Sequence, residues 1–170
     1  MAYGVVRTDL LAGTDLRDQV VSVKYMGAGS TATAIENGNV CLLSGMAAID
    51  QSTNERQIFK GVTPSANSSL DDIVLIASPE VMYDERKKDL DEFRNEAGDI
   101  ARGFRLHHGG IFSVTGDALQ GDCDVDSIIE LQAGAKMKAV SSLTSGSTQV
   151  GTCIAKETAG KYTFYVIQIV

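Results

Sequence analysis

Short apolar runs alternate along this chain with turns that are rich in glycine, serine, threonine and asparagine. Runs of this length, bounded by turn residues, are typical of β-strands rather than helices. The final run, YTFYVIQIV, has the strongest strand pattern because it is aromatic and β-branched. The pattern predicts about nine or ten strands, at residues 20–26, 40–43, 57–62, 73–77, 100–106, 111–114, 128–131, 135–140, 149–154 and 162–170.

This arrangement predicts a mainly β fold, a compact β-barrel or β-sandwich of short antiparallel strands with at most one or two short helices. No linker or repeat divides residues 1–170, so we expect a single domain. The charged stretch 84–96 fits a short exposed helix and a solvated loop equally well. Residues 100–106 and 111–114 suggest a hairpin that turns at His108-Gly109-Gly110.

The first sixteen residues are apolar but irregular, and Gly4 and Gly13 interrupt any long element. We expect residues 1–16 to form an N-terminal arm that packs on its own domain or on a neighbouring subunit. The segment lacks a basic start followed by an apolar block, so we do not expect a secretion signal and place the protein in a cytoplasm when it is made.

Composition argues against several classes of function and site. The net charge of −7 disfavours direct binding to nucleic acid, because an acidic surface repels phosphates. No run of about 18 apolar residues is present, so we expect no membrane span. Cys41, Cys123 and Cys153 are odd in number and form no CxxC pair, which argues against a disulfide framework or zinc site. Cys41 and Cys153 lie within apolar runs and are expected to be reduced core residues.

Residues 27–32 (GAGSTA) match the glycine-rich turn of dinucleotide-binding proteins, and Asp50 lies at the usual distance for a ribose contact. That site needs a helix after the turn, since the pyrophosphate lies at its N-terminus. Here the turn residues 36–39 (ENGN) follow too soon, and no apolar stripe is present. We therefore interpret the tract as a small-residue loop and expect no cofactor.

Alternating carboxylates at Asp122, Asp124 and Asp126, with Glu130 downstream, could wrap a calcium ion. The helix–loop–helix calcium motif needs glycine and glutamate where this chain has Ser127 and Ala133, so a solvated acidic turn is the preferred interpretation and no metal is expected.

Other candidate catalytic groups also lack the partners they need. His107 and His108 are adjacent, which does not suit ligation of one metal from a strand, and no G-x-S-x-G elbow supplies an esterase nucleophile. The acidic pairs at 84–85 and 91–92 lie among arginines and lysines, as on a solvated face rather than in a glycosidase site. We expect no enzymatic activity.

The order of segments resembles a family of small head-associated proteins, the decoration or cement proteins of tailed bacteriophages and prophages. The residues that carry the resemblance are AYGVVRTD at 2–9, VVSVKYM at 20–26, ENGNV at 36–40, FKGVTPSAN at 59–67, DIVLIASPEVMYDERK at 72–87, LDEFRNEAGDIARGFRLHHGGIFSVT at 90–115, IIELQAGAKMKAV with LTSGSTQVG at 128–151, and YTFYVIQI at 162–169. These segments contain no catalytic motif.

The resemblance implies a structural virion protein that binds the outer surface of an assembled phage head and stabilises it. Its partner would be the major capsid protein. It would act as a homo-oligomer, and a trimer is favoured because it can bind several capsomer subunits at once. On this basis we expect apolar residues of the arm at a capsid or subunit interface: Tyr3, Val5, Val6, Leu10 and Leu11.

Two other functions remain open. The chain could be a tail, vertex or other minor virion component, which copy number per particle would distinguish. It could also be a carbohydrate-binding or adhesion module, although such sites usually display aromatic platforms. Tryptophan is absent, and four of the five tyrosines lie in strand-like runs or in the arm.

Overall fold

The computed structural model describes residues 2–8, 19–29, 31–47, 58–84 and 86–170, and it confirms the predicted mainly β fold. The named helical elements are three short 3-10 turns, η2 (Leu70–Asp72), η3 (Leu90–Glu92) and η4 (Gly116–Ala118). The strands are β1 (Val20–Tyr25), β2 (Val40–Met46), β3 (Ile58–Val62), β4 (Ile73–Ile76), β5 (Ile100–Arg105), β6 (Ile111–Thr115), β7 (Leu119–Gln120), β8 (Ile128–Glu130), β9 (Met137–Val140), β10 (Gln149–Ala159) and β11 (Tyr162–Ile169).

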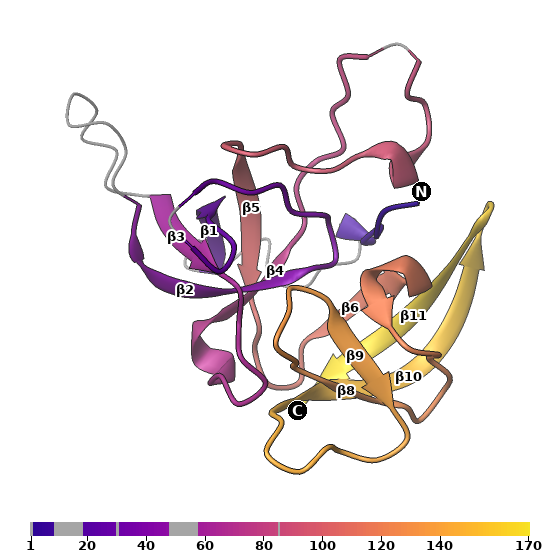
Figure 1. Cartoon of the computed structure of the whole chain (residues 1–170). Helices are drawn as coiled ribbons and strands as arrows, with labels where there is room; N and C mark the ends of the chain where they lie inside the picture. The colour runs from indigo at the N-terminus through magenta and orange to yellow at the C-terminus, as the bar shows by residue number, and fades with distance from the viewer. Residues whose placement is uncertain (1, 9–18, 30, 48–57, 85) are drawn as a thin grey trace.

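The first five strands close into a small barrel in the order β1-β3-β2-β4-β5 (Figure 1). β5 completes the barrel by pairing with β1, and β1 with β3 is its one parallel pair. The interior contains small or branched side chains, including Val23, Cys41 and Ala101. Most of these side chains are small or branched because the barrel is narrow. Tyr25 is an aromatic member of the same cluster, and its hydroxyl lies 2.7 Å from Thr63 Oγ1.

The remaining six strands form a second sheet in the order β6-β11-β10-β8-β9-β7. Its longest element is the β10–β11 hairpin, whose turn contains Gly160 in the left-handed region at φ 61°. Neighbouring strands are antiparallel as predicted, except β7 and β9, which run parallel. Register shifts in β10 bend this sheet around the core.

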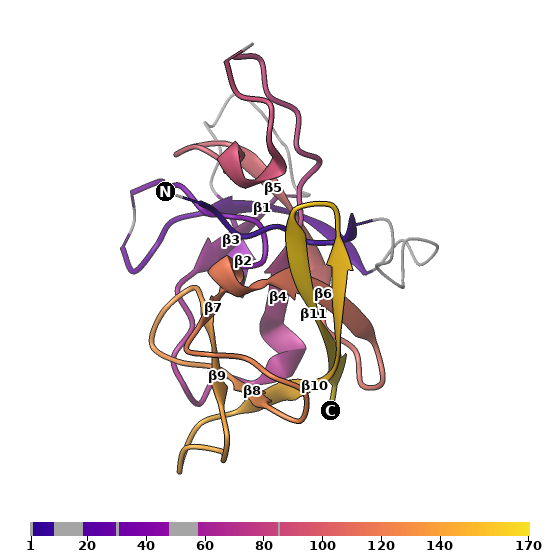
Figure 2. The same cartoon turned by 90° about the vertical axis from the view of Figure 1, so that its right-hand side faces the viewer.

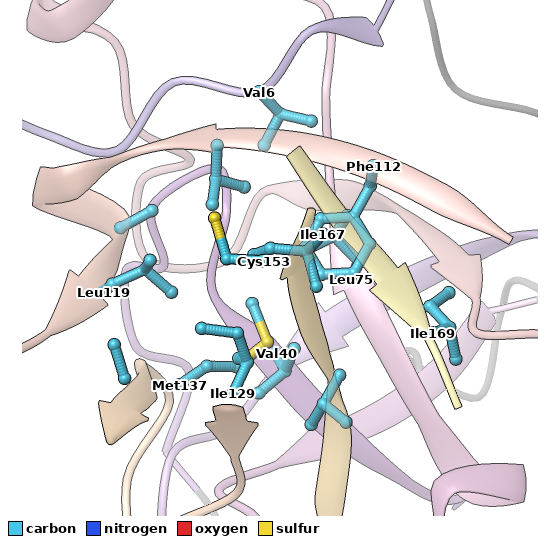
Figure 3. Close-up of a cluster of buried hydrophobic side chains, with 14 of the residues drawn as sticks. Val6, Val40, Leu75, Phe112, Leu119, Ile129, Met137, Cys153, Ile167 and Ile169 are labelled. Atoms are coloured by element: carbon cyan, nitrogen blue, oxygen red, sulfur yellow. The ribbon is translucent and has the colours of Figure 1, made fainter. Parts of the chain in front are cut away.

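One hydrophobic cluster joins the barrel to the second sheet (Figure 3). Leu75 of β4 comes from the barrel, whereas Phe112 of β6 and Ile167 of β11 come from the second sheet. Val6 of the N-terminal segment belongs to the same cluster. The two sheets thus share a core.

The predicted hairpin between residues 100–106 and 111–114 is wrong. β5 pairs with β1 and β4 in the barrel, whereas β6 pairs with β11 in the second sheet. The intervening turn is tight, because the Gly110 amide donates to the His107 carbonyl at 2.9 Å. This turn connects the barrel to the second sheet. β5 and β6 therefore do not pair, although they are adjacent in sequence and joined by a short turn.

Glu130, at the end of β8, is a fully buried carboxylate with good partners. It accepts hydrogen bonds from the Thr144 amide at 2.8 Å and the Thr144 hydroxyl at 2.7 Å. The Lys138 ammonium lies 3.7 Å away. Burial raises the pKa of Glu130, but the Thr144 hydrogen bonds and Lys138 outweigh it, so the pKa lies below its ordinary value of 4.5.

Because its folded pKa is depressed, Glu130 contributes stability above the unfolded value of about 4.5 that is lost as the pH falls through the lower folded value. We expect the free energy of unfolding to fall less steeply below about pH 4.5 in Glu130→Gln than in the wild type. Urea unfolding at a series of pH values measures this. The exposed Glu157→Gln is the control, and equal slopes for wild type and Glu130→Gln would contradict the assignment.

Candidate docking surface

The glycine-rich tract and the histidine pair do not form sites in the structure. Gly27 turns the chain with φ 59°, and no helix follows within residues 31–47. Asp50 lies outside the described residues. His107 and His108 are both exposed at the turn between β5 and β6. Within the described residues, neither motif is hydrogen-bonded or ion-paired to a side chain that would give it chemistry.

The alternating aspartates form a turn. The Ser127 amide donates to the Asp124 carbonyl at 3.1 Å, and Asp126 adopts a left-handed φ of 70°. Glu130 points elsewhere, into its contacts with Thr144. Among the described residues, no group of three or more His, Cys, Asp and Glu side chains is placed to hold a metal ion. Burial raises the pKa values of the Cys41 and Cys123 thiols to about 12, so neither is an activated nucleophile.

The N-terminal segment packs on its own domain. Val5 and Val6 are 1% and 3% exposed, and the Thr115 amide of β6 donates to the Val5 carbonyl at 3.0 Å. Tyr3 is half-buried, with the Arg94 guanidinium 5.5 Å from its ring. Leu10 and Leu11 lie outside the described residues. Val5 and Val6 are too buried in this structure to contact a partner, so we do not include them in the candidate docking surface. That residues of the arm lie at a capsid or subunit interface stays a prediction.

The most prominent surface feature is the loop between β4 and β5, residues 77–99, with residue 85 outside the described set. It projects from the barrel on the same side as the tip of the β10–β11 hairpin (Figures 1 and 2). Tyr83 is 95% exposed and Val81 is 60% exposed. Leu90 in the loop and Ile100 at its end are also large exposed hydrophobic residues. Exposed apolar groups gathered on one projection are typical of interaction surfaces.

Asn37 holds the base of this loop. Its buried side-chain amide donates to the Ser78 carbonyl at 2.9 Å and to Glu80 Oε1 at 3.2 Å. Its Oδ1 accepts from the Ser78 amide at 2.9 Å. At the other end of the loop, Asn95 donates to the Ile35 carbonyl at 3.1 Å. The loop lacks strands, but both of its ends are fastened to the 35–37 segment.

Asn37→Ala is expected to lower the free energy of unfolding by about 2–3 kcal/mol, because it leaves the buried amide and carbonyl of Ser78 without partners. Urea denaturation measures the loss. The matched control is Asn67→Ala, since Asn67 is exposed and accepts only a local hydrogen bond from Ser65. Equal stability of the two variants would show that Asn37 does not brace the loop.

The hairpin tip braces the side of the loop. Lys161 Nζ lies 2.7 Å from Asp89 Oδ2 and 3.0 Å from Asp91 Oδ1, and the Tyr162 hydroxyl donates to the same Asp91 oxygen at 2.8 Å. Asp89 and Asp91 raise the pKa of Lys161, and Lys161 in turn holds the pKa of Asp91 below its usual value. The Tyr3 amide donates to the Asp91 carbonyl at 3.0 Å, so three distant segments meet here.

A cavity of about 620 Å³ lies where the loop meets the barrel. Its lining combines apolar side chains of the loop, such as Val81 and Phe93, with Ile100 and Arg102 of β5. A smaller cavity of about 330 Å³ shares Pro79, Val81 and Arg102 with it. The two therefore form one groove along the base of the loop, which we call the β5 groove.

The sequence pattern did not predict this surface. The charged stretch 84–96 indicated a helix or a loop, and the short Val81-Met82-Tyr83 run before it was not recognised as exposed. The structure shows a loop with the single turn η3 there. The available signal was an apolar run next to Pro79 and followed by charges.

Comparison of the chain with models of protein families, with curated proteins and with solved structures finds no match. In the described part of the chain, no helix has the length and apolar character needed to cross a membrane.

Proposed function

We propose that this chain is a non-enzymatic structural protein of a tailed-phage particle, a decoration protein that binds the outer surface of the capsid. The observation that carries the proposal is the projecting 77–99 loop, which presents Val81 and Tyr83 to a partner. The resemblance of the sequence to head-associated proteins supports the same function, and so does the acidic charge, which does not suit binding to packaged nucleic acid.

The way the loop is held also suits docking. Asn37 fastens its base at Ser78 and Lys161 pairs with Asp89 and Asp91, so the segment that carries the apolar residues is held on both sides before binding. Preorganised surfaces lose less conformational entropy on association. A capsid repeats its binding site many times, and a homo-oligomer, with a trimer favoured, would engage several sites at once.

The test is cosedimentation of the purified chain with phage heads assembled without it. We expect the wild type to sediment with heads at saturating stoichiometry and Val81→Ser/Tyr83→Ser to bind at least tenfold more weakly, because two exposed apolar anchors are lost. Val125→Ser/Leu143→Ser is the matched control, since it removes two exposed hydrophobic side chains elsewhere. Heads that retain no wild-type chain would contradict the proposed function.

The exposed ring of Tyr83 also favours a second candidate, a carbohydrate-binding or adhesion module. Sugar rings stack on exposed aromatic faces, and Tyr83 lies beside a cavity that contains polar groups. A glycan array distinguishes the two functions. Binding of a defined sugar that is lost in Tyr83→Ser, with no binding to heads, would replace the decoration function with this one.

A further inference from the structure

We infer that the β5 groove binds an extended peptide segment of a partner protein, with a carboxylate of the peptide paired to Arg102 and an apolar side chain of the peptide placed against Ile100. This inference rests on the proposed function only for the identity of the partner, a capsid subunit. The chemistry of the ligand follows from the groove itself.

Arg102 stands out among the arginines of the described residues. Arg86 and Arg94 pair with Asp84 and Glu96 at 2.9 Å, and Arg105 donates to the Asp71 carbonyl at 3.4 Å. The Arg7 guanidinium lies over the Phe164 ring. The exposed guanidinium of Arg102 makes no hydrogen bond or ion pair within the described part of the chain. Among the described residues, Arg102 is the one lysine or arginine that lines the groove, and the carboxylates of Asp99 and Glu80 line it as well. Neither carboxylate forms an ion pair with Arg102, so the guanidinium is left to bind the carboxylate of a ligand.

The backbone fixes Arg102 in place. Its amide donates to the Ser78 hydroxyl at 2.9 Å, and its carbonyl accepts from the Ala77 amide at 2.9 Å. Both contacts lie at the start of the 77–99 loop, which Asn37 fastens to the body. The backbone of Arg102 is therefore held beside the loop at the base of the groove, and its exposed side chain extends from this anchored position.

The floor of the groove follows the outer face of β5. Ala101 and Gly103 face the barrel interior, so Ile100, Arg102 and Phe104 share the opposite face. Ile100 and Arg102 line the larger cavity, and Arg102 and Phe104 line the smaller one. Pro79 and Val81 form a wall that both cavities share. A ligand lying along this floor meets the exposed Ile100 side chain and then the Arg102 cation, whereas Phe104 borders the smaller cavity but is 6% exposed and packs into the core.

This spacing selects the ligand. Alternate residues of a strand lie about 7 Å apart, and alternate residues of an extended peptide have the same spacing. A peptide with an apolar residue two positions from an aspartate or glutamate can therefore contact Ile100 and Arg102 together. Tyr83 lines the larger cavity and makes no hydrogen bond within the described residues, so its amide and carbonyl are available to the peptide backbone.

The test uses the isotope-labelled full chain and the peptide acetyl-Thr-Leu-Thr-Asp-Thr-amide, titrated to millimolar concentration and followed by amide chemical shifts. We expect saturable shifts at residues 80–83 and 100–104, and binding of the matched asparagine peptide that is about fivefold weaker or more. In Arg102→Gln the two peptides should bind equally. Arg105→Gln is the control and should keep the preference, because Arg105 lies on the same strand but pairs with Asp71.

Equal binding of the two peptides to the wild type, no shifts at millimolar peptide, or shifts confined to other residues would each overturn the inference. So would a preference for the aspartate peptide that survives in Arg102→Gln. The peptide titration contains no phage particle, so its failure overturns the peptide site alone, whereas failure to sediment with heads overturns the decoration function alone.

Discussion

Replacing Phe112 by alanine is expected to lower the free energy of unfolding by about 3–5 kcal/mol, the range found for large-to-small changes of aromatic residues in protein cores. Phe112 is 2% exposed and lies in the cluster shared by the barrel and the second sheet (Figure 3). The cavity left by its ring would be bordered by Leu75 of the barrel and Ile167 of the second sheet, so both sheets lose packing together.

Urea unfolding followed by circular dichroism and by tyrosine fluorescence checks this prediction. Tyrosines lie in the barrel (Tyr25) and in the second sheet (Tyr162 and Tyr165), so the fluorescence signal includes the unfolding of both sheets. We expect one transition by both probes, moved to lower urea in Phe112→Ala. Ile111→Ala is the matched control, because the neighbouring side chain is 41% exposed and its loss should change stability little. Two separate transitions, of which the substitution moves only one, would show that the sheets do not share a cooperative core.

The second large effect is expected at Gly61 in β3, where alanine should destabilise the fold by about 2–3 kcal/mol. A Cβ atom at this position would lie 2.6 Å from Val23 Cγ1 and 2.9 Å from Cys41 Sγ. Both neighbours are fully buried in the closed barrel, so neither can move aside without disturbing other strands. The narrow interior thus depends on the absence of this one side chain.

A double-mutant cycle shows whether the clash is the cause. Val23→Ala alone leaves a cavity and is expected to destabilise, but combined with Gly61→Ala it makes room for the new methyl group. We expect the double variant to be at least about 1 kcal/mol more stable than the sum of the single effects predicts. Gly29→Ala is the control, because an added Cβ there meets no atom within 4 Å. Strict additivity would contradict the steric explanation.

Local pattern predicted the strands but not their partners. The run YTFYVIQIV became β11, and Ile73–Ile76 became a fully buried strand as its unbroken apolar character indicated. β1 pairs with β3 in parallel, and β6 pairs with β11 rather than with β5. Both pairings depend on contacts between residues far apart in sequence. Periodicity carries no information on such contacts, which explains why the hairpin around His108 was wrongly predicted.

The candidate docking surface was harder to predict for a related reason. The exposure of Tyr83 depends on how Asn37 and Lys161 hold the loop, and both lie more than about 40 residues away in sequence. The sequence IARGFRL contains two arginines in similar positions and does not indicate that only Arg102 lacks an ion pair or hydrogen bond of its side chain within the described residues. The structure separates them, because Arg105 finds the Asp71 carbonyl and Arg102 faces the groove.

Quantitative mass spectrometry of purified particles tests most directly our proposal that this chain decorates a phage head. We expect hundreds of copies per particle, in a ratio to the major capsid protein of one or a simple fraction. A handful of copies would place the chain in the tail or at a vertex instead. Complete absence from particles that are produced in cells expressing the chain would contradict the proposed decoration function.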